Sequence, residues 1–173
     1  MDKMGEIELN LRVNKVEMRK SKHDEQFNFW SGVLFGLGLV AFIDEAVFHQ
    51  LLHWHHFYDK STTSMGLITD GIFHAFSWFA TVVSLFMLAD LRKRKIWDGK
   101  QWAGATILGA GVFQLYDGII QHKVMGLHQI RYNVEVIYYD VVWNIIAGFM
   151  IIIGLILLIQ RKASKTKGKV SET

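Results

Sequence analysis

Residues 36–55 read GLGLVAFIDEAVFHQLLHWH, and residues 109–128 read GAGVFQLYDGIIQHKVMGLH. Both stretches are apolar segments in which two glycines, an aspartate and two histidines recur at one constant separation, which we call the repeat offset. The recurring pairs are Gly36 and Gly109, Gly38 and Gly111, Asp44 and Asp117, His49 and His122, and His55 and His128. Ionisable side chains are costly inside an apolar span and usually mark a functional site. The sequence therefore predicts a duplicated unit that carries a polar site.

The fold class follows from the distribution of the apolar residues. Hydrophobic residues make up 51% of the 173 residues and gather in four blocks, at residues 29–52, 66–90, 102–125 and 136–160. Each block is close to the roughly 20 residues that a helix needs to cross a bilayer. We therefore predict an all-α integral membrane protein, a four-helix bundle built from two tandem two-helix repeats.

The predicted transmembrane domain covers residues 29–160, with one repeat at 29–90 and the other at 102–160. Residues 1–28 and 161–173 form polar tails on either side of it. The first tail is compatible with a short strand or with no regular structure, and the second has the composition of a disordered segment. The chain contains no proline, so we expect each span to be a continuous helix.

The basic residues predict the orientation of the chain in the membrane. Sixteen of the 19 lysines and arginines fall in the two tails or between the second and third blocks. The two opposite loops hold only Lys60, Lys123 and Arg131. Basic residues concentrate on the cytoplasmic side of membrane proteins, so both termini are expected in the cytoplasm. The basic tails are expected to contact the lipid bilayer, and no binding of nucleic acid is expected.

The acidic and histidine residues of neighbouring spans are expected to meet at matched depths in the outer half of the membrane. The expected neighbours are His49 with Asp70, Asp44 with His74, His122 with Asp140, and Asp117 with Asn144. Imidazole and carboxylate groups are the ligands of zinc, iron, manganese and oxidised copper. The chain has no cysteine, which excludes iron–sulfur clusters, thiolate zinc sites and blue copper centres.

These residues predict a transition-metal site that holds two ions, or one ion on the axis between the repeats. Iron, copper and zinc are not distinguished by the sequence, and no catalytic residue is assigned, so whether the protein is an enzyme stays open. The candidate ligands are Asp44, Glu45, His49, His53, His55, His56, Asp70, His74, Asp117, His122, His128 and Asp140.

The first half of the chain is the richer candidate. Glu45, His49 and His53 are spaced four residues apart, which places them along one face of a regular helix and makes the two histidines a chelating pair. His55 and His56 are expected at the outer interface, where they would guard the way in or deliver an ion.

Three motifs carry a resemblance to a known family. They are DEAVFHQLLHWHH at residues 44–56, DGIFH at residues 70–74 and DGIIQHKVMGLH at residues 117–128. Together they resemble an uncharacterised family of bacterial predicted membrane proteins, from the first span to the fourth. The resemblance implies a multi-pass protein of the bacterial inner membrane with four spans. Some genes of the family lie near cytochrome oxidase assembly factors, which implies copper or haem handling. The family pattern has Asp-Gly where this chain has Asp44-Glu45.

Several functions are compatible with the sequence. The preferred one is metal handling, for example in oxidase assembly, or metal-dependent chemistry. A second is a b-type cytochrome in which His49 and His122 are the axial haem ligands. The polar pairs could also fasten helices without any cofactor, or the aspartates could relay protons or cations across the membrane. A larger membrane complex or a homo-oligomer is compatible with each of these functions.

Overall fold

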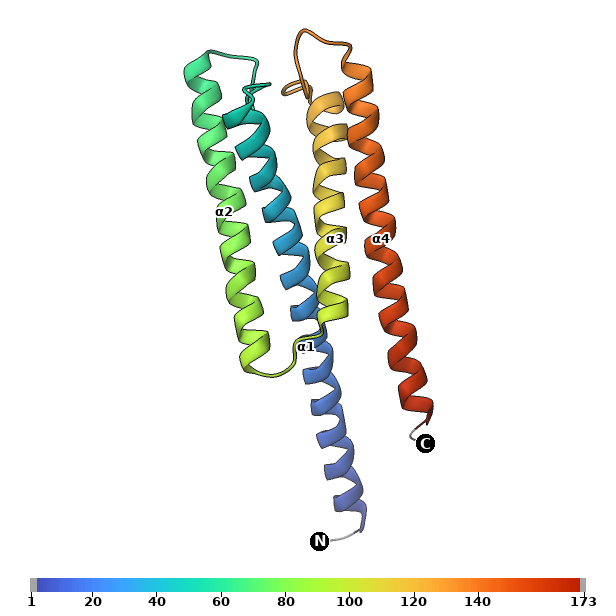
Figure 1. The fold of residues 1–173 in the computed structure, drawn as a ribbon. Helices are drawn as coiled ribbons and strands as arrows, with labels where there is room; N and C mark the ends of the chain where they lie inside the picture. The colour runs from blue at the N-terminus through green and yellow to red at the C-terminus, as the bar shows by residue number, and fades with distance from the viewer. Residues whose placement is uncertain (1–2, 172–173) are drawn as a thin grey trace.

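The computed structural model describes residues 3–171, and the side chains of residue 7 and residues 11–166 within them. All the regular secondary structure of the described chain is helical (Figure 1). Its elements are α1 (Lys3–Asp44), the π-helical segment η1 (Glu45–Leu51), α2 (Thr63–Lys93), α3 (Gly99–Tyr116), the π-helical segment η2 (Asp117–Val124) and α4 (Val136–Ser171).

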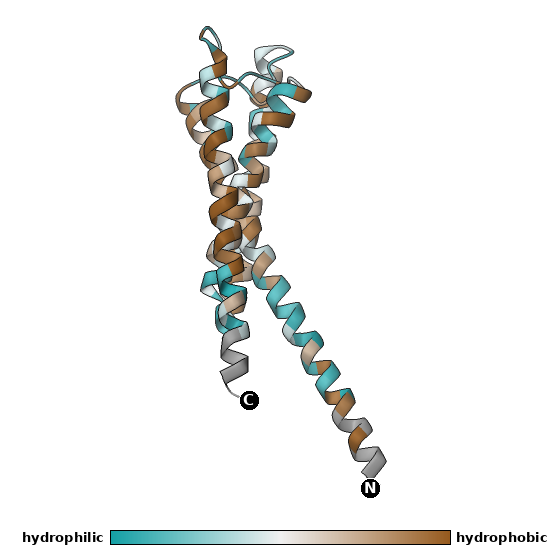
Figure 2. Cartoon of the chain, turned by 90° about the vertical axis from the view of Figure 1, so that its right-hand side faces the viewer, coloured by the Kyte–Doolittle hydropathy of each residue, from teal (hydrophilic) through white to brown (hydrophobic). Residues whose placement is uncertain are grey.

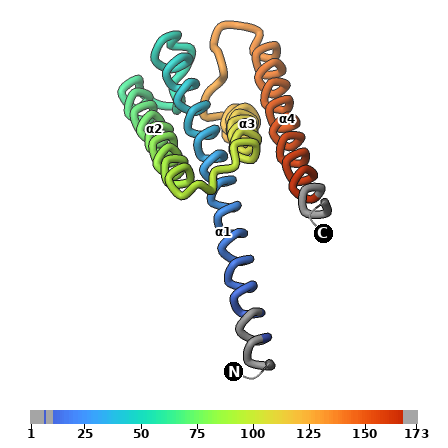
Figure 3. Tube along the Cα trace, turned by 60° about the horizontal axis from the view of Figure 1, so that its bottom comes forward, coloured from blue at the N-terminus to red at the C-terminus, as the bar shows by residue number. Residues whose placement is uncertain are grey.

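The four predicted membrane spans are confirmed. Four helical stretches are long and apolar enough to cross a membrane, and each covers nearly all or all of one of the blocks seen in the sequence. Figure 2 shows the apolar residues concentrated in the bundle and polar residues along the part of α1 that precedes it. Helix α1 extends well beyond the predicted span and leaves the bundle as a separate arm (Figure 3). Neither described tail segment is a strand or an irregular coil, since α1 begins at Lys3 and α4 continues to Ser171.

Helices α1 and α3 form the central pair of the bundle. Helix α2 packs against α1, and α4 packs against α3, so that the four helices lie in the order α2, α1, α3, α4 (Figure 1). The two halves of the chain therefore contribute equivalent pairs, with their first helices in contact at the centre. Both termini lie at one end of the bundle, and the segments η1 and η2 lie at the other, which we call the distal end.

Glycines allow the central helices to approach closely. A Cβ atom on Gly36 would lie 1.9 Å from the carbonyl oxygen of Thr106, and one on Gly109 would lie 2.3 Å from that of Val33. The two contacts are related by the repeat offset, because Val33 corresponds to Thr106 and Gly36 to Gly109. Small residues at such crossings are typical of membrane helices that pack through their backbones. At this contact, α1 and α3 pack backbone against backbone.

Polar contacts join the helices at the end that carries the termini. The Asn28 side chain donates a hydrogen bond of 3.0 Å to the side chain of Gln101, again across α1 and α3 and between positions related by the repeat offset. The Arg161 guanidinium donates to Asp98 at 2.8 Å and also pairs with Glu25. These bonds connect α1 and α4 to the start of α3.

The helices α1 and α3 both change to a π-helical pattern near their distal ends. The Leu52 amide bonds to the Val47 carbonyl at 2.9 Å, and the Met125 amide bonds to the Ile120 carbonyl at 2.7 Å. Both bonds span five residues instead of the usual four, and such segments occur frequently at functional sites. The chain therefore stays helical through these regions, as predicted, but the hydrogen-bond pattern at η1 and η2 is π-helical and not α-helical.

Candidate metal centre

Three groups of buried residues at the distal end could hold a metal ion. One of them, Glu45, His49 and Asp70, joins α2 to η1. The other two are equivalent triads, each formed near the distal end of α1 or α3 and in the loop that follows. In each triad, one ligand atom from an aspartate and one from each of two histidines lie within 4.8 Å of one another. The first triad is Asp44, His49 and His55, and the second triad is Asp117, His122 and His128. Their members correspond one to one through the repeat offset.

The π-helical segments position the first two members of each triad. Asp44 directly precedes η1 and His49 lies within it, and Asp117 and His122 have the same spacing in η2. A π-helical turn brings residues four and five apart onto one side of the helix, because its hydrogen bonds span five residues. The Asp117 Oδ2 atom lies 3.1 Å from His122 Nε2, and Asp44 Oδ2 lies 3.8 Å from His49 Nε2.

The third member of each triad comes from the loop that follows, and the two loops hold each other's histidines. His55 Nδ1 lies 2.9 Å from the carbonyl oxygen of Ile130, and His128 Nδ1 lies 2.9 Å from that of Phe57. A carbonyl oxygen only accepts, so the Nδ1 atom of each ring carries the proton and Nε2 presents its lone pair. This is the arrangement in which a backbone carbonyl orients a metal-ligating histidine.

Both loop histidines are neutral at physiological pH. Burial lowers the pKa of His128 to about 4, although the Asp117 carboxylate acts in the opposite direction. Burial also lowers the pKa of His55 far below its ordinary value, and the neighbouring histidines lower it further. A neutral imidazole is the form that binds a metal ion.

The four imidazole rings pack into one continuous cluster. The rings of His55 and His128 stack at 4.4 Å with an interplanar angle of 5°. The ring of His49 contacts that of His55 at 4.4 Å, and the ring of His122 contacts that of His128 at 4.6 Å. In all four rings the Nε2 atom is buried and makes no hydrogen bond of suitable geometry among the described residues, although aspartate oxygens lie near it at 3.1 Å in His122 and 3.8 Å in His49. Four unpartnered nitrogens in one buried cluster are unusual, because buried polar atoms are nearly always satisfied.

Further carboxylates orient the rings from behind. His49 Nδ1 lies 2.9 Å from Glu45 Oε2 and 3.1 Å from Asp70 Oδ1, which confirms the expected neighbours His49 and Asp70. His122 Nδ1 lies 3.8 Å from Asp140 Oδ1, so these two residues are neighbours as expected, but no hydrogen bond joins them. Carboxylates behind the ring fix the tautomer of a ligating histidine and raise its basicity.

The structure departs from the predicted site at His74. This residue is exposed on α2, where its ring packs at 5.3 Å against Phe42, and Asp44 is paired with His49 instead. The prediction was wrong because the π-helical turn brings Asp44 to a histidine of its own segment. The Asn144 side chain donates a hydrogen bond of 2.8 Å to the Asp140 carbonyl. Its Oδ1 atom lies next to Gly118, where it would be 2.7 Å from an added Cβ atom.

The structure also separates the predicted chelating pair of His49 and His53. The π-helical segment ends at Leu51, and His53 is exposed with a φ of 49°. His55, expected at the interface, is instead buried in the first triad, with 6% of its surface exposed. His56 is half-buried, and its Nδ1 atom lies 2.6 Å from Asp70 Oδ2.

Three contributors to the site were missed in the sequence. The carbonyls of Phe57 and Ile130 hold the loop histidines, and these two residues are also related by the repeat offset. Extending the repeat beyond His55 would have included both positions. The residue type at a position, however, does not reveal whether its backbone carbonyl takes part in a site. Lys123, read only as a loop charge, pairs with the Asp140 carboxylate.

Comparison with known proteins places this chain among membrane proteins. A family model described as "Predicted membrane protein (DUF2243)" matches residues 31–161, which include both triads and most of the four-helix bundle. The chain belongs to this family. The resemblance to an uncharacterised family of predicted membrane proteins is thereby confirmed. No curated protein and no solved structure matches the chain.

Proposed function

We propose that this member of the DUF2243 family binds two transition-metal ions, one in each triad, at the distal end of its bundle. The observation that carries the proposal is the set of four unpartnered Nε2 atoms, each buried beside an aspartate of its own triad. Histidines that only fasten helices would be expected to use both ring nitrogens in hydrogen bonds. A metal ion in each triad would give all four nitrogens a partner.

The charges around the triads support the same proposal. Five carboxylates lie within or behind the triads, each with at most 3% of its surface exposed. Lys123 is the only lysine or arginine that pairs with any of them in the part of the chain that the structure describes. Buried charges are costly unless they are paired or bind metals. Two divalent cations together with Lys123 would balance five ionised carboxylates. The five are Asp44, Glu45, Asp70, Asp117 and Asp140.

The donor set indicates the class of metal and what it could do. Each triad offers two imidazoles and one carboxylate, a set used by iron(II) and, in catalytic sites, by zinc. Three protein ligands leave coordination positions open for water or a substrate. A bound ion of this class would supply Lewis-acid or redox chemistry at those positions. The chain's own contribution is to hold the imidazoles in place through the carbonyls of Phe57 and Ile130 and the carboxylate of Asp70.

The haem alternative fits the geometry less well. Axial ligation by His49 and His122 would require a porphyrin between their rings. The rings of His55 and His128 lie between those of His49 and His122. The distances between ring centres are 4.4 Å from His49 to His55, 4.4 Å from His55 to His128 and 4.6 Å from His128 to His122. A relay of protons across the membrane is also less well supported, because the aspartates gather at one end of the bundle and form no path through it.

The orientation proposed from the basic residues places the triads toward the outer face of the bacterial inner membrane. The two tails and the loop between α2 and α3 carry most of the lysines and arginines and would face the cytoplasm. The distal end, with its two loops, would then face outward, and the metal ions would be acquired from that side.

Metal content and the visible spectrum of the protein test the proposal. We expect detergent-purified protein to contain iron, zinc or another first-row metal, near two ions per chain, without a Soret band. His74→Ala should leave that content unchanged, because His74 lies outside both triads. A Soret band would support the haem alternative. If the folded protein binds no metal even when metal is supplied, the triads only stabilise the packing of the helices, and the proposal is refuted.

A further inference from the structure

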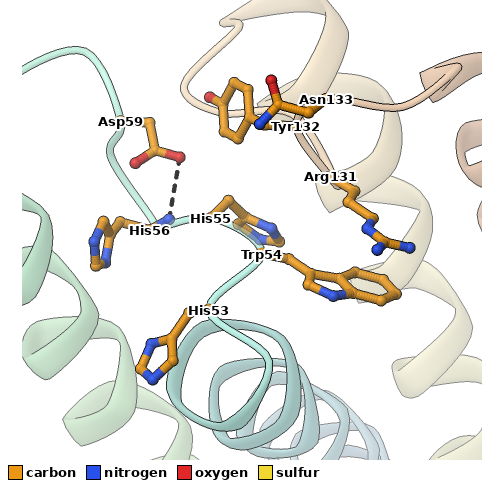
Figure 4. Close-up of a pocket in the computed structure, with 8 residues that line it drawn as sticks. All are labelled: His53, Trp54, His55, His56, Asp59, Arg131, Tyr132 and Asn133. Atoms are coloured by element: carbon orange, nitrogen blue, oxygen red, sulfur yellow. Dashed lines mark hydrogen bonds between the residues drawn. The ribbon is translucent and has the colours of Figure 1, made fainter.

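A polar cavity of about 410 Å³ opens at the distal end, and its lining includes His55 of the first triad. It is formed by the loop after η1 and the loop after η2, so both halves of the chain contribute to it (Figure 4). Its lining residues are His53, Trp54, His55, His56, Asp59, Arg131, Tyr132 and Asn133. Three of the eight histidines of the chain therefore gather in one open cavity.

His55 connects this cavity to the metal centre. The residue lines the cavity and is also a member of the first triad, where its Nε2 atom has no partner. Figure 4 places its ring at the middle of the cavity, between the histidines on one side and Arg131 on the other. An ion in the cavity would therefore be next to a ligand of the buried centre.

The backbone at His53 has a conformation that glycine adopts more readily than histidine. His53 has a φ of 49°, and its counterpart in the second half, Gly126, has a φ of 56°. Glycine adopts this left-handed conformation without steric cost, whereas a residue with a Cβ atom does not. No hydrogen bond or ion pair of the described residues involves the His53 side chain. The first half of the chain thus has an exposed histidine at this position. The second half has glycine, which suits this backbone conformation better.

His56 is oriented in the manner of a metal ligand. Its Nδ1 atom lies 2.6 Å from one oxygen of Asp70, whose other oxygen lies 3.1 Å from Nδ1 of His49. One carboxylate therefore orients both a cavity histidine and a triad histidine. Asp59 lies beside His56 and accepts its backbone N–H at 3.1 Å (Figure 4).

Arg131 forms the opposite wall and is held there. Its guanidinium lies 4.7 Å from the centre of the Trp54 ring and donates to the Tyr139 hydroxyl at 2.7 Å. These contacts keep the positive charge away from the side that carries His53, His56 and Asp59 (Figure 4). That side offers imidazole nitrogens and a carboxylate, the donors of a transient site for a transition-metal cation.

We propose that this cavity is the access route by which a divalent transition-metal cation reaches the buried triads, with His53, His56 and Asp59 as its first ligands. The inference rests on the proposed function, since it assigns the way in to the same metal centre. It predicts that His53 governs the rate of metal uptake and has no part in the number of ions held at equilibrium.

The test compares uptake of Co²⁺ by metal-free, detergent-purified full-length protein with that of His53→Gly. This variant places in the first half the residue found at the equivalent position of the second. We expect its thermal midpoint to equal or exceed that of the wild type, its final Co²⁺ content to be unchanged, and its uptake to be about threefold to tenfold slower. His74→Ala, which removes an exposed histidine outside the cavity, should change neither quantity.

The possible outcomes separate the two proposals. Uptake by His53→Gly at the wild-type rate would overturn the access route while the metal centre stands. A lower Co²⁺ content at equilibrium would also overturn it, because His53 would then belong to the centre itself. Failure of wild-type protein to bind Co²⁺ would refute the proposed function and this inference with it.

Discussion

Gly36→Ala is expected to destabilise the protein strongly, although the change adds a single methyl group. The new Cβ atom would lie 1.9 Å from the Thr106 carbonyl oxygen and 2.9 Å from the Ala110 backbone nitrogen. Backbone atoms cannot rotate aside, so α1 and α3 would have to separate along their central contact. Overpacking of this kind typically costs about 1 to 3 kcal/mol, and occasionally more. Thermal unfolding in detergent, followed by circular dichroism, measures the loss.

A matched control separates the steric effect from the loss of a glycine. A Cβ atom on Gly148 would meet nothing within 4 Å, so Gly148→Ala makes the same chemical change in open space. That variant should be as stable as the wild type or more stable, because alanine favours the helix by about 1 kcal/mol over glycine. Gly109→Ala should resemble Gly36→Ala, since its Cβ atom would lie 2.3 Å from the Val33 carbonyl oxygen. Equal midpoints for Gly36→Ala and Gly148→Ala would contradict the close central contact.

Removal of one histidine from either triad is expected to remove one of two metal ions. His49→Ala deletes a ligand of the first triad, and His122→Ala deletes the corresponding ligand of the second. Each variant keeps the other triad intact, so each should retain about half of the wild-type metal, and the double variant should retain none. The quantity to measure is the number of ions per chain after dialysis against a fixed concentration of Zn²⁺.

The same variants distinguish two ions from one shared ion. If a single ion lay on the axis between the halves, each single variant would lower the content of that one ion, and wild-type protein would hold one per chain. His74→Ala is the appropriate control, because this histidine is exposed on α2 and belongs to neither triad. A wild-type content of one ion, lost in both single variants, would contradict the two-ion centre.

Much of this architecture was predictable because apolar length and repeated spacing are properties of the sequence. The four spans follow from the apolar blocks, and the constant repeat offset predicted that equivalent residues of the two halves would contribute to one site. The pairing of His49 with Asp70 followed from matched depth in antiparallel helices. These features depend on residue type and on the separation between positions, both of which can be counted.

The features that the sequence did not predict depend on local changes of backbone geometry. A regular helix would place His53 on the face of His49 and leave Asp44 to pair with His74. The π-helical segment brings Asp44 and His49 together, and the chain leaves the helix before His53. The hydrogen bonds from the loop histidines to the carbonyls of Phe57 and Ile130 were equally inaccessible, since every residue has a carbonyl group.

X-ray absorption at the K edge of the bound metal identifies the atoms that coordinate it. We expect a first shell of nitrogen and oxygen atoms only, with the multiple-scattering pattern of about two imidazoles per metal ion, in agreement with two histidines and one aspartate in each triad. This pattern should be lost in protein that carries both His49→Ala and His122→Ala. A porphyrin spectrum, a shell without imidazole, or an unchanged spectrum in the double variant would contradict a metal centre built from the two triads.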